Sequence, residues 1–197
     1  MVEIKKIEKL WRWFEDNQNN FGEKFNNESV VLHLDELVTD LGPFTWEIGP
    51  GSFKDRMLAI SPNGDIKKLP ETEYIVSFAP SLKKWEFYSS KPIKKAGNIF
   101  YFNYNEEKTK IDANEWEYFL LQVEDNYFEI EIIAKNLVSF EVDTQQMLGE
   151  ILLDNILGEK KRMLTFQYID VNCNIDNFYL KKLTNINHLR DHLESLL

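Results

Sequence analysis

Two apolar runs joined by a short polar turn constrain the fold of this chain more than any other stretch. The runs are WEYFLLQVE at 116–124 and YFEIEII at 127–133, and Asp125-Asn126 separates them. A two-residue turn of this kind favours a β-hairpin. It would align three apolar cross-strand pairs on one face, Val123 with Phe128, Leu121 with Ile130 and Phe119 with Ile132.

Helical and strand periodicity alternate along the rest of the chain. Apolar spacing predicts helices over 3–21, 29–41, 70–79, 143–157 and 184–197. Alternation and turn residues predict further strands over 44–48, 56–61, 85–90 and 163–171. This order indicates an α+β fold with a mainly antiparallel sheet, helices packed on one of its faces, and helices at both termini.

The 143–157 helix has apolar residues around much of its circumference. Leu148 and Leu152 share one side, while Leu153 and Leu157 lie far round the helix. Such a helix is either buried on both sides or meets a partner, so a self-associating module that dimerises through this helix stays open. Gly149 in its interior is unfavourable for a helix and predicts a close backbone approach.

Length, cysteine content and the N-terminal pattern bound the class of protein. A chain of 197 residues fits one α+β domain over 1–197. No run approaches the ~20 apolar residues of a membrane span, and the N-terminal helix lacks the pattern of a signal peptide. The single cysteine, Cys173, permits no internal disulfide, so we expect a cytoplasmic protein that does not associate with membranes.

The net charge of −10 is concentrated in one segment. Residues 101–160 contain 14 Asp or Glu and 4 Lys or Arg, whereas the remaining 137 residues contain 19 of each sign. An acidic field disfavours nucleic acid, whose binding requires Lys and Arg, and it attracts basic partners. The segment is either a solvated face that keeps the chain soluble or a surface that binds a basic protein.

The most motif-like glycine stretch, Gly49-Pro50-Gly51-Ser52, does not match a phosphate-binding loop. Such a loop presents backbone N–H groups to an anion in front of a helix. Pro50 has no N–H, no Walker lysine follows, and the alternation that comes next is typical of a strand. We predict a hairpin connector between 44–48 and 56–61.

No residue constellation predicts catalysis, a cofactor or a metal. His188 and His192 share a helix face, but no HExxH pattern surrounds them, and Cys173 has no nucleophile motif around it. The paired carboxylates Glu129 and Glu131 fall on the polar face of the hairpin, which predicts ordinary solvated acids. We therefore assign no catalytic, cofactor-binding or metal-binding residue.

Aromatic residues beside the acids favour a protein-binding surface instead. Most Trp and Phe occupy periodic core positions, whereas Trp13 and Tyr127 are candidates for exposure. The candidate partner-binding residues are Glu106, Glu107, Glu124, Tyr127, Glu129, Glu131 and Trp13.

Four segments together resemble a family of uncharacterised bacterial single-domain proteins of about this length. They are LWRWFEDNQNNF, FTWEIGPGSFKDRMLAISPNGD, FAPSLKKWEFYSSKP and LLDNILGEKKR. The resemblance implies one cytoplasmic domain encoded as a stand-alone unit, and it carries over no functional residue.

Two classes of function remain open. The first is a non-enzymatic acidic binding module, in its most concrete form an immunity-type protein that neutralises a basic toxin such as a nuclease. The alternative is an enzyme or small-molecule-binding protein with an unrecognised carboxylate-based site, which would require a deep pocket with convergent polar groups.

Overall fold

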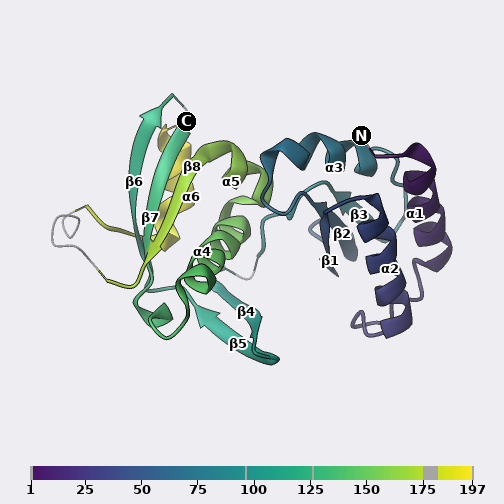
Figure 1. The fold of residues 1–197 in the computed structure, drawn as a ribbon, viewed down its shortest axis with the longest axis horizontal. Helices are drawn as coiled ribbons and strands as arrows, with labels where there is room; N and C mark the ends of the chain where they lie inside the picture. The colour runs from purple at the N-terminus through teal and green to yellow at the C-terminus, as the bar shows by residue number, and fades with distance from the viewer. Residues whose placement is uncertain (1, 96, 126, 175–181, 197) are drawn as a thin grey trace. The chain divides into compact units, whose positions relative to one another are not determined.

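The computed structural model describes residues 2–95, 97–125, 127–174 and 182–196. The chain divides into two compact units, Met1–Lys91 (unit 1) and Pro92–Leu197 (unit 2), each with its own sheet and hydrophobic core. The α+β class expected from the sequence is confirmed (Figure 1). Whether the two units act as one domain stays a prediction.

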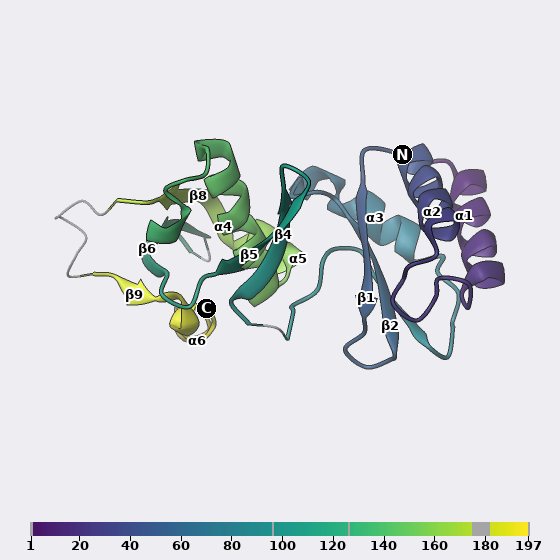
Figure 2. The same cartoon turned by 90° about the horizontal axis from the view of Figure 1, so that it is seen from below.

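Unit 1 is a three-stranded sheet with helices packed against it. Its elements are α1 (Ile4–Asn17), α2 (Glu28–Leu41), β1 (Thr45–Pro50), β2 (Arg56–Ser61), η1 (Ile66–Lys68), α3 (Leu69–Val76) and β3 (Trp85–Tyr88). The strand order is β1-β2-β3, with β1 antiparallel and β3 parallel to β2. Helices α1 and α2 lie on the same side of this sheet (Figures 1 and 2).

Aromatic side chains fill the core of unit 1. Phe14 of α1 packs edge-on against Trp85 of β3, with ring centroids 4.8 Å apart. The two buried indoles of this core each donate to a backbone carbonyl, Trp11 Nε1 to Ile75 at 2.8 Å and Trp85 Nε1 to Gln18 at 3.1 Å. These bonds satisfy polar N–H groups that burial would otherwise leave without a partner.

In its described residues, unit 2 combines a separate hairpin, a four-stranded sheet and three helices. Its elements are β4 (Ile99–Tyr104), β5 (Glu107–Asp112), β6 (Glu117–Glu124), β7 (Tyr127–Ile133), η2 (Lys135–Leu137), α4 (Val142–Leu157), α5 (Glu159–Thr165), β8 (Phe166–Asn172), β9 (Thr184–Asn185), η3 (Ile186–His188) and α6 (Leu189–Leu196). The sheet order is β8-β7-β6-β9, and β7 and β8 run parallel.

Helices α4 and α6 cover one face of the four-stranded sheet. A Cβ on Gly149 of α4 would overlap Val171 Cγ2 of β8, so the helix backbone lies directly on the sheet, as predicted. In α6, His192 Nδ1 lies 2.7 Å from the Tyr118 hydroxyl of β6. Arg190 of α6 also donates to the Ile156 carbonyl near the end of α4, through Nε at 3.2 Å.

Both apolar sides of α4 are used within unit 2. Leu148 and Leu152 are fully buried, and so are Leu153 and Leu157 on the other side of the helix. The apolar surface that suggested a homodimer through 143–157 is therefore occupied by this chain's own core. The dimer itself stays a prediction.

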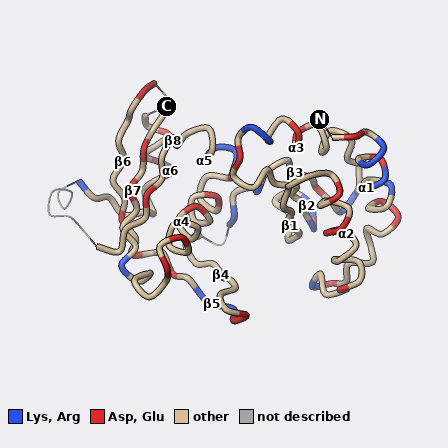
Figure 3. Tube along the Cα trace, in the orientation of Figure 1, with Lys and Arg blue, Asp and Glu red and all other residues tan. Residues whose placement is uncertain are grey.

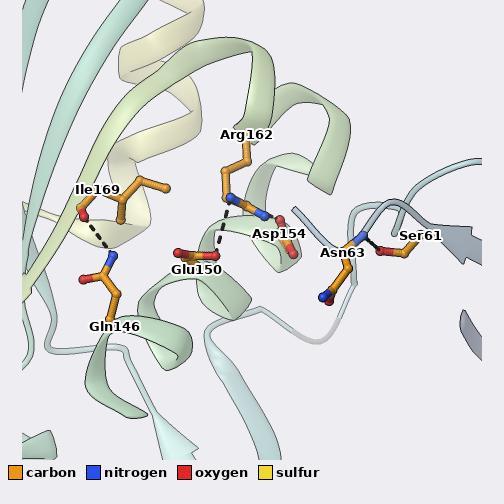
Figure 4. Close-up of polar contacts among 7 residues, drawn as sticks. All are labelled: Ser61, Asn63, Gln146, Glu150, Asp154, Arg162 and Ile169. Carbon is orange, nitrogen blue, oxygen red and sulfur yellow. Dashed lines mark hydrogen bonds and ion pairs between the residues drawn. The ribbon is translucent and has the colours of Figure 1, made fainter. Parts of the chain in front are cut away.

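The start of β8 is anchored by an ion pair between α4 and α5. Arg162 of α5 donates through Nε to Asp154 Oδ1 at 2.5 Å, and its Nη1 lies 3.7 Å from Glu150 Oε2 (Figure 4). Arg162 and Asp154 are both buried, so the charges compensate each other in a low-dielectric environment. Gln146 of α4 reaches the Ile169 carbonyl of β8 at 2.8 Å in the same view.

One hairpin was not predicted, and two elements begin several residues later than predicted. The β4–β5 hairpin was not predicted as strands, because its alternation is weak and Asn105 and Glu106 adopt positive φ in the turn. The strand predicted over 163–171 begins at Phe166, since 159–165 form α5. The predicted C-terminal helix begins at Leu189, after β9 and a short 3₁₀ turn.

The predicted register of the β6–β7 hairpin was also wrong. Glu124 pairs with Tyr127, as a two-residue turn requires, but a bulge between Gln122 and Glu124 shifts the remaining pairs by one residue. Ile130 therefore lies opposite Leu120 rather than Leu121. Because side chains alternate along a strand, this shift exchanges the faces of β6.

Candidate functional site

The register places a set of exposed and partly exposed side chains on the sheet face opposite α4 and α6. We call this surface the open face. It consists of Phe119, Leu121, Tyr127, Glu129, Glu131, Tyr168 and Asp170. Leu121 is 47% and Tyr168 58% exposed, so no element among the described residues covers these two side chains. Figure 1 shows that β6, β7 and β8, which carry these residues, lie side by side.

Two rows of paired residues cross the open face. In the first row Glu129 pairs with Leu121 on one side and with Tyr168 on the other. In the second row Glu131 pairs with Phe119 and with Asp170. Each row therefore has a carboxylate at its centre on β7 and an aromatic ring on a neighbouring strand.

The two rows enclose a shallow depression of about 130 Å³. It is lined by Phe119, Leu121, Glu129, Ile130, Glu131, Tyr168 and Asp170. The volume is well below the ~300–1,000 Å³ of small-molecule pockets, so the depression can take one side chain rather than a substrate molecule.

Two polar contacts define the electrostatics of the second row. Asn172 Nδ2 donates to Glu131 Oε1 and to Asp170 Oδ2, both at 2.8 Å. This one amide group therefore holds the two carboxylates close to each other. The Lys182 ammonium lies 5.5 Å from the centre of the Phe119 ring. This cation–π contact places a positive charge of the chain itself on the open face.

The structure brings together some of the predicted partner-binding residues. Tyr127, Glu129 and Glu131 belong to the open face, and Glu124 is exposed at the end of the same hairpin. Figure 3 shows acidic residues along this hairpin.

The other three predicted residues lie elsewhere. Glu106 and Glu107 are exposed at the β4–β5 turn, away from the four-stranded sheet. Trp13 belongs to unit 1 and is only half-exposed, because its ring packs 5.1 Å from that of His33 and 6.3 Å from that of Phe21. Trp13 is therefore less exposed than expected, since the loop after α1 folds back and places Phe21 beside it.

Four residues of the open face were not predicted as site residues: Phe119, Leu121, Tyr168 and Asp170. Phe119 and Leu121 were assigned to the buried face by the incorrect register. Tyr168 and Asp170 join the site through the parallel pairing of β8 with β7, which has no local sequence signal. Gln167-Tyr168 interrupts the apolar pattern of β8 and was the one available hint of an exposed aromatic.

A second hollow lies at the opposite end of β6 and has a polar lining. This groove of about 690 Å³ is lined by Asp112, Asn114, Glu115, Trp116, Glu117, Lys135, Asn136 and Asn185. Several of these groups are engaged in the fold, since Asn136 accepts from Trp116 Nε1 at 2.7 Å and donates to the Asp112 carbonyl at 2.9 Å. The groove favours the small-molecule alternative.

The glycine-rich stretch at 49–52 belongs to the predicted β1–β2 hairpin, but Gly49 and Pro50 end β1, paired with Met57 and Arg56, and only Gly51 and Ser52 lie in the connector. Its backbone nevertheless binds an anion, which is the Glu86 carboxylate of β3. The N–H groups of Ser52, Phe53 and Lys54 all donate to Glu86, those of Phe53 and Lys54 at 3.0 and 3.1 Å. A Cβ on Gly51 would lie 2.7 Å from Glu86 Oε1, so only glycine leaves room for the carboxylate.

These hydrogen bonds change the acidity of Glu86. Burial alone would raise its pKa, but donors from Ser52, Phe53, the Tyr88 hydroxyl and Lys54 outweigh the burial, and the pKa of Glu86 lies below its ordinary value. The carboxylate therefore stabilises the loop as a structural anion and leaves it no free place for a phosphate.

His192 and Cys173 were among the histidine and cysteine candidates for chemistry, and the structure describes the surroundings of both. Among the described residues, no group of three or more His, Cys, Asp or Glu side chains could hold a metal ion. His192 contacts the Tyr118 hydroxyl, and burial raises the pKa of Tyr118 to about 12. Burial also raises the pKa of Cys173, which makes its thiol a weaker nucleophile at neutral pH.

Comparisons with models of known protein families, with curated proteins and with solved structures give no match. Within the described residues, no helix has the length and apolar character needed to span a bilayer.

Proposed function

We propose that this protein is a non-enzymatic binding module that captures a basic protein on the open face of unit 2. In its most specific form it is a cytoplasmic immunity-type protein that neutralises a basic toxin such as a nuclease. The observation that supports this function is the alignment of Glu129, Glu131 and Asp170 with exposed aromatic and aliphatic side chains on one uncovered sheet face.

The charge distribution agrees with such a partner. The acidic excess of the chain lies in residues 101–160, and β6 and β7 run through the middle of that segment. Acidic groups on a binding surface accelerate encounter with a basic partner and disfavour acidic competitors. Nucleic acid itself would be repelled by this surface.

The apolar side chains of the open face supply binding energy that its charges alone would not. Exposed charges contribute little affinity in water, whereas Tyr, Phe and Leu at the centre of a contact give most of the binding energy of protein interfaces. Tyr168 and Leu121 flank Glu129 directly, so a docking partner would bury apolar area and neutralise a carboxylate at the same place.

The experiment compares capture of basic proteins by three immobilised forms of the full chain. The forms are wild type, the open-face variant E129Q/E131Q/D170N and the control E8Q/E15Q/D16N, whose substitutions lie on exposed positions of α1. Both variants remove three negative charges. Lysate of the native host is applied at about 0.05 M and about 0.5 M salt, so that screening separates electrostatic capture from apolar capture.

We expect wild type and the α1 control to retain the same basic protein and the open-face variant to lose it. Retention should be weaker at high salt. Failure to retain any basic protein at either salt concentration, or equal retention by both variants, would exclude this function.

The polar groove favours a second candidate, the binding of a small polar molecule near Asp112, Glu115 and Glu117. Thermal unfolding of wild type and of E115Q/E117Q, measured against a panel of polyamines, amino acids and sugars, tests it. A compound that raises the Tm of wild type but not of the variant would support this candidate, and no shift with any compound would remove it.

A further inference from the structure

We propose that the depression between β6, β7 and β8 is an arginine subsite, which receives one guanidinium side chain of the basic partner. This inference rests on the proposed function and adds the chemical identity of the contacting group. It follows from the carboxylates, the aromatic rings and the size of the depression.

The carboxylates are arranged as a pair. Glu131 and Asp170 occupy paired positions on parallel strands, and Asn172 fixes both through one amide nitrogen. That amide uses Oε1 of Glu131 and Oδ2 of Asp170, and each carboxylate has a second oxygen that can accept a further hydrogen bond. A guanidinium has several N–H donors in one plane and can bridge two such oxygens, whereas an ammonium acts as a compact point charge.

The rings favour the same group. Phe119 and Tyr168 lie on the two strands that flank β7, at opposite ends of the two rows. A planar guanidinium stacks on an aromatic face while its edge bonds to carboxylates, so both contacts can form at once. Because the Lys182 ammonium already contacts the Phe119 ring, Tyr168 is the ring on which the guanidinium would stack.

The size of the depression selects a single side chain. The depression has a volume of about 130 Å³ and is open to solvent. Glu131, Asp170 and Tyr168 are among the residues that line it. A side chain that projects from a partner surface can enter it, while the surrounding residues Leu121 and Tyr127 stay exposed for contact with the partner's backbone and apolar groups.

The test measures binding of three labelled nonapeptides to the full chain by fluorescence anisotropy: nona-arginine, nona-lysine and nona-citrulline. Citrulline retains the planar shape of arginine without its charge. The proteins are wild type, E131Q/D170N, Y168A and the charge-matched control E15Q/D16N. Circular dichroism of each variant confirms that the fold is retained.

We expect wild type and E15Q/D16N to bind nona-arginine about fivefold or more tightly than nona-lysine, and nona-citrulline weakly. E131Q/D170N should lose about tenfold in affinity for nona-arginine, and Y168A should bind both basic peptides with similar affinity.

Two results would overturn the arginine subsite. If nona-arginine and nona-lysine bind wild type equally and both are lost in E131Q/D170N, the open face binds basic proteins without an arginine subsite, and the proposed function survives. If E131Q/D170N binds nona-arginine as well as E15Q/D16N does, the depression does not receive the side chain at all.

Discussion

Gly149 of α4 lies against Val171 of β8 so closely that a Cβ at position 149 would overlap the valine side chain. This contact fixes the helix on one face of the four-stranded sheet. The opposite face, which carries Glu129, Glu131 and Tyr168, is therefore the one that α4 does not cover. The interior glycine that weakens the helix locally is thus required by the packing that creates the open face.

The first prediction concerns this contact. G149A should destabilise unit 2 by about 1–3 kcal/mol, because the overlap with Val171 outweighs the gain in helix propensity of about 1 kcal/mol. Urea denaturation followed by circular dichroism gives the free energy of unfolding. G49A is the matched control, since a Cβ there meets only Met57 Cε at 3.5 Å. Equal stability of G149A and wild type would contradict the close approach.

The second prediction tests the hairpin register. L120A should cost about 2 kcal/mol, because Leu120 packs against the core of unit 2, whereas L121A should cost less than about 0.5 kcal/mol. The two substitutions are chemically identical and lie on adjacent residues, so each serves as the control of the other. If L121A were less stable than L120A, the bulge would be absent and the originally predicted register would be correct.

The third prediction uses the low pKa of Glu86. A carboxyl group whose pKa is lower in the folded protein stabilises it above the unfolded pKa, near 4.5, and loses this effect as the pH falls through the folded pKa. E86Q should therefore be less stable than wild type by about 1 kcal/mol at neutral pH, and the difference should shrink below about pH 4.5.

Tryptophan fluorescence during urea denaturation, repeated from about pH 3 to about pH 7, measures this difference. E23Q, on an exposed position of unit 1, is the control and should match wild type throughout. A deficit of E86Q that stays constant over the whole pH range would show that the loop is not stabilised by the ionised carboxylate.

The fourth prediction concerns the buried ion pair of α4 and α5. R162M should destabilise the protein by about 3–5 kcal/mol, because it leaves the Asp154 carboxylate buried without its guanidinium. The double variant D154L/R162M should recover most of this loss, since neither charge then remains to be compensated. R12M, on an exposed position of α1, is the control. Additive destabilisation in the double variant would argue against direct coupling of the two charges.

Much of the secondary structure follows from the sequence alone. The helices α1, α2 and α4 have apolar residues at helical spacing, and β1, β2, β6 and β7 have alternation bounded by turn residues, so local patterns were sufficient. The positions of β4 and β5 were missed because their strands bury few residues and their turn relies on positive φ at Asn105 and Glu106.

The candidate site could be predicted only in part. Glu129, Glu131 and Tyr127 were identified from the acidic hairpin because they lie on one strand and alternate with Phe128 and Ile130. Asp170 and Tyr168 were not, since their pairing with β7 is parallel and depends on a crossover through α4 and α5. The face of Phe119 was misassigned because one bulged residue is invisible in the periodicity of its strand.

The sequence by itself determined the α+β class, the concentration of acidic charge in residues 101–160 and the structural role of Gly49-Pro50-Gly51-Ser52. These properties depend on residue type and near-neighbour spacing. Only the tertiary structure decided that the loop N–H groups bind Glu86, that Gly149 touches Val171 and that Glu131 lies beside Asp170. Each of these contacts joins residues far apart in the chain, and their geometry is set by how the helices and strands pack rather than by any local pattern.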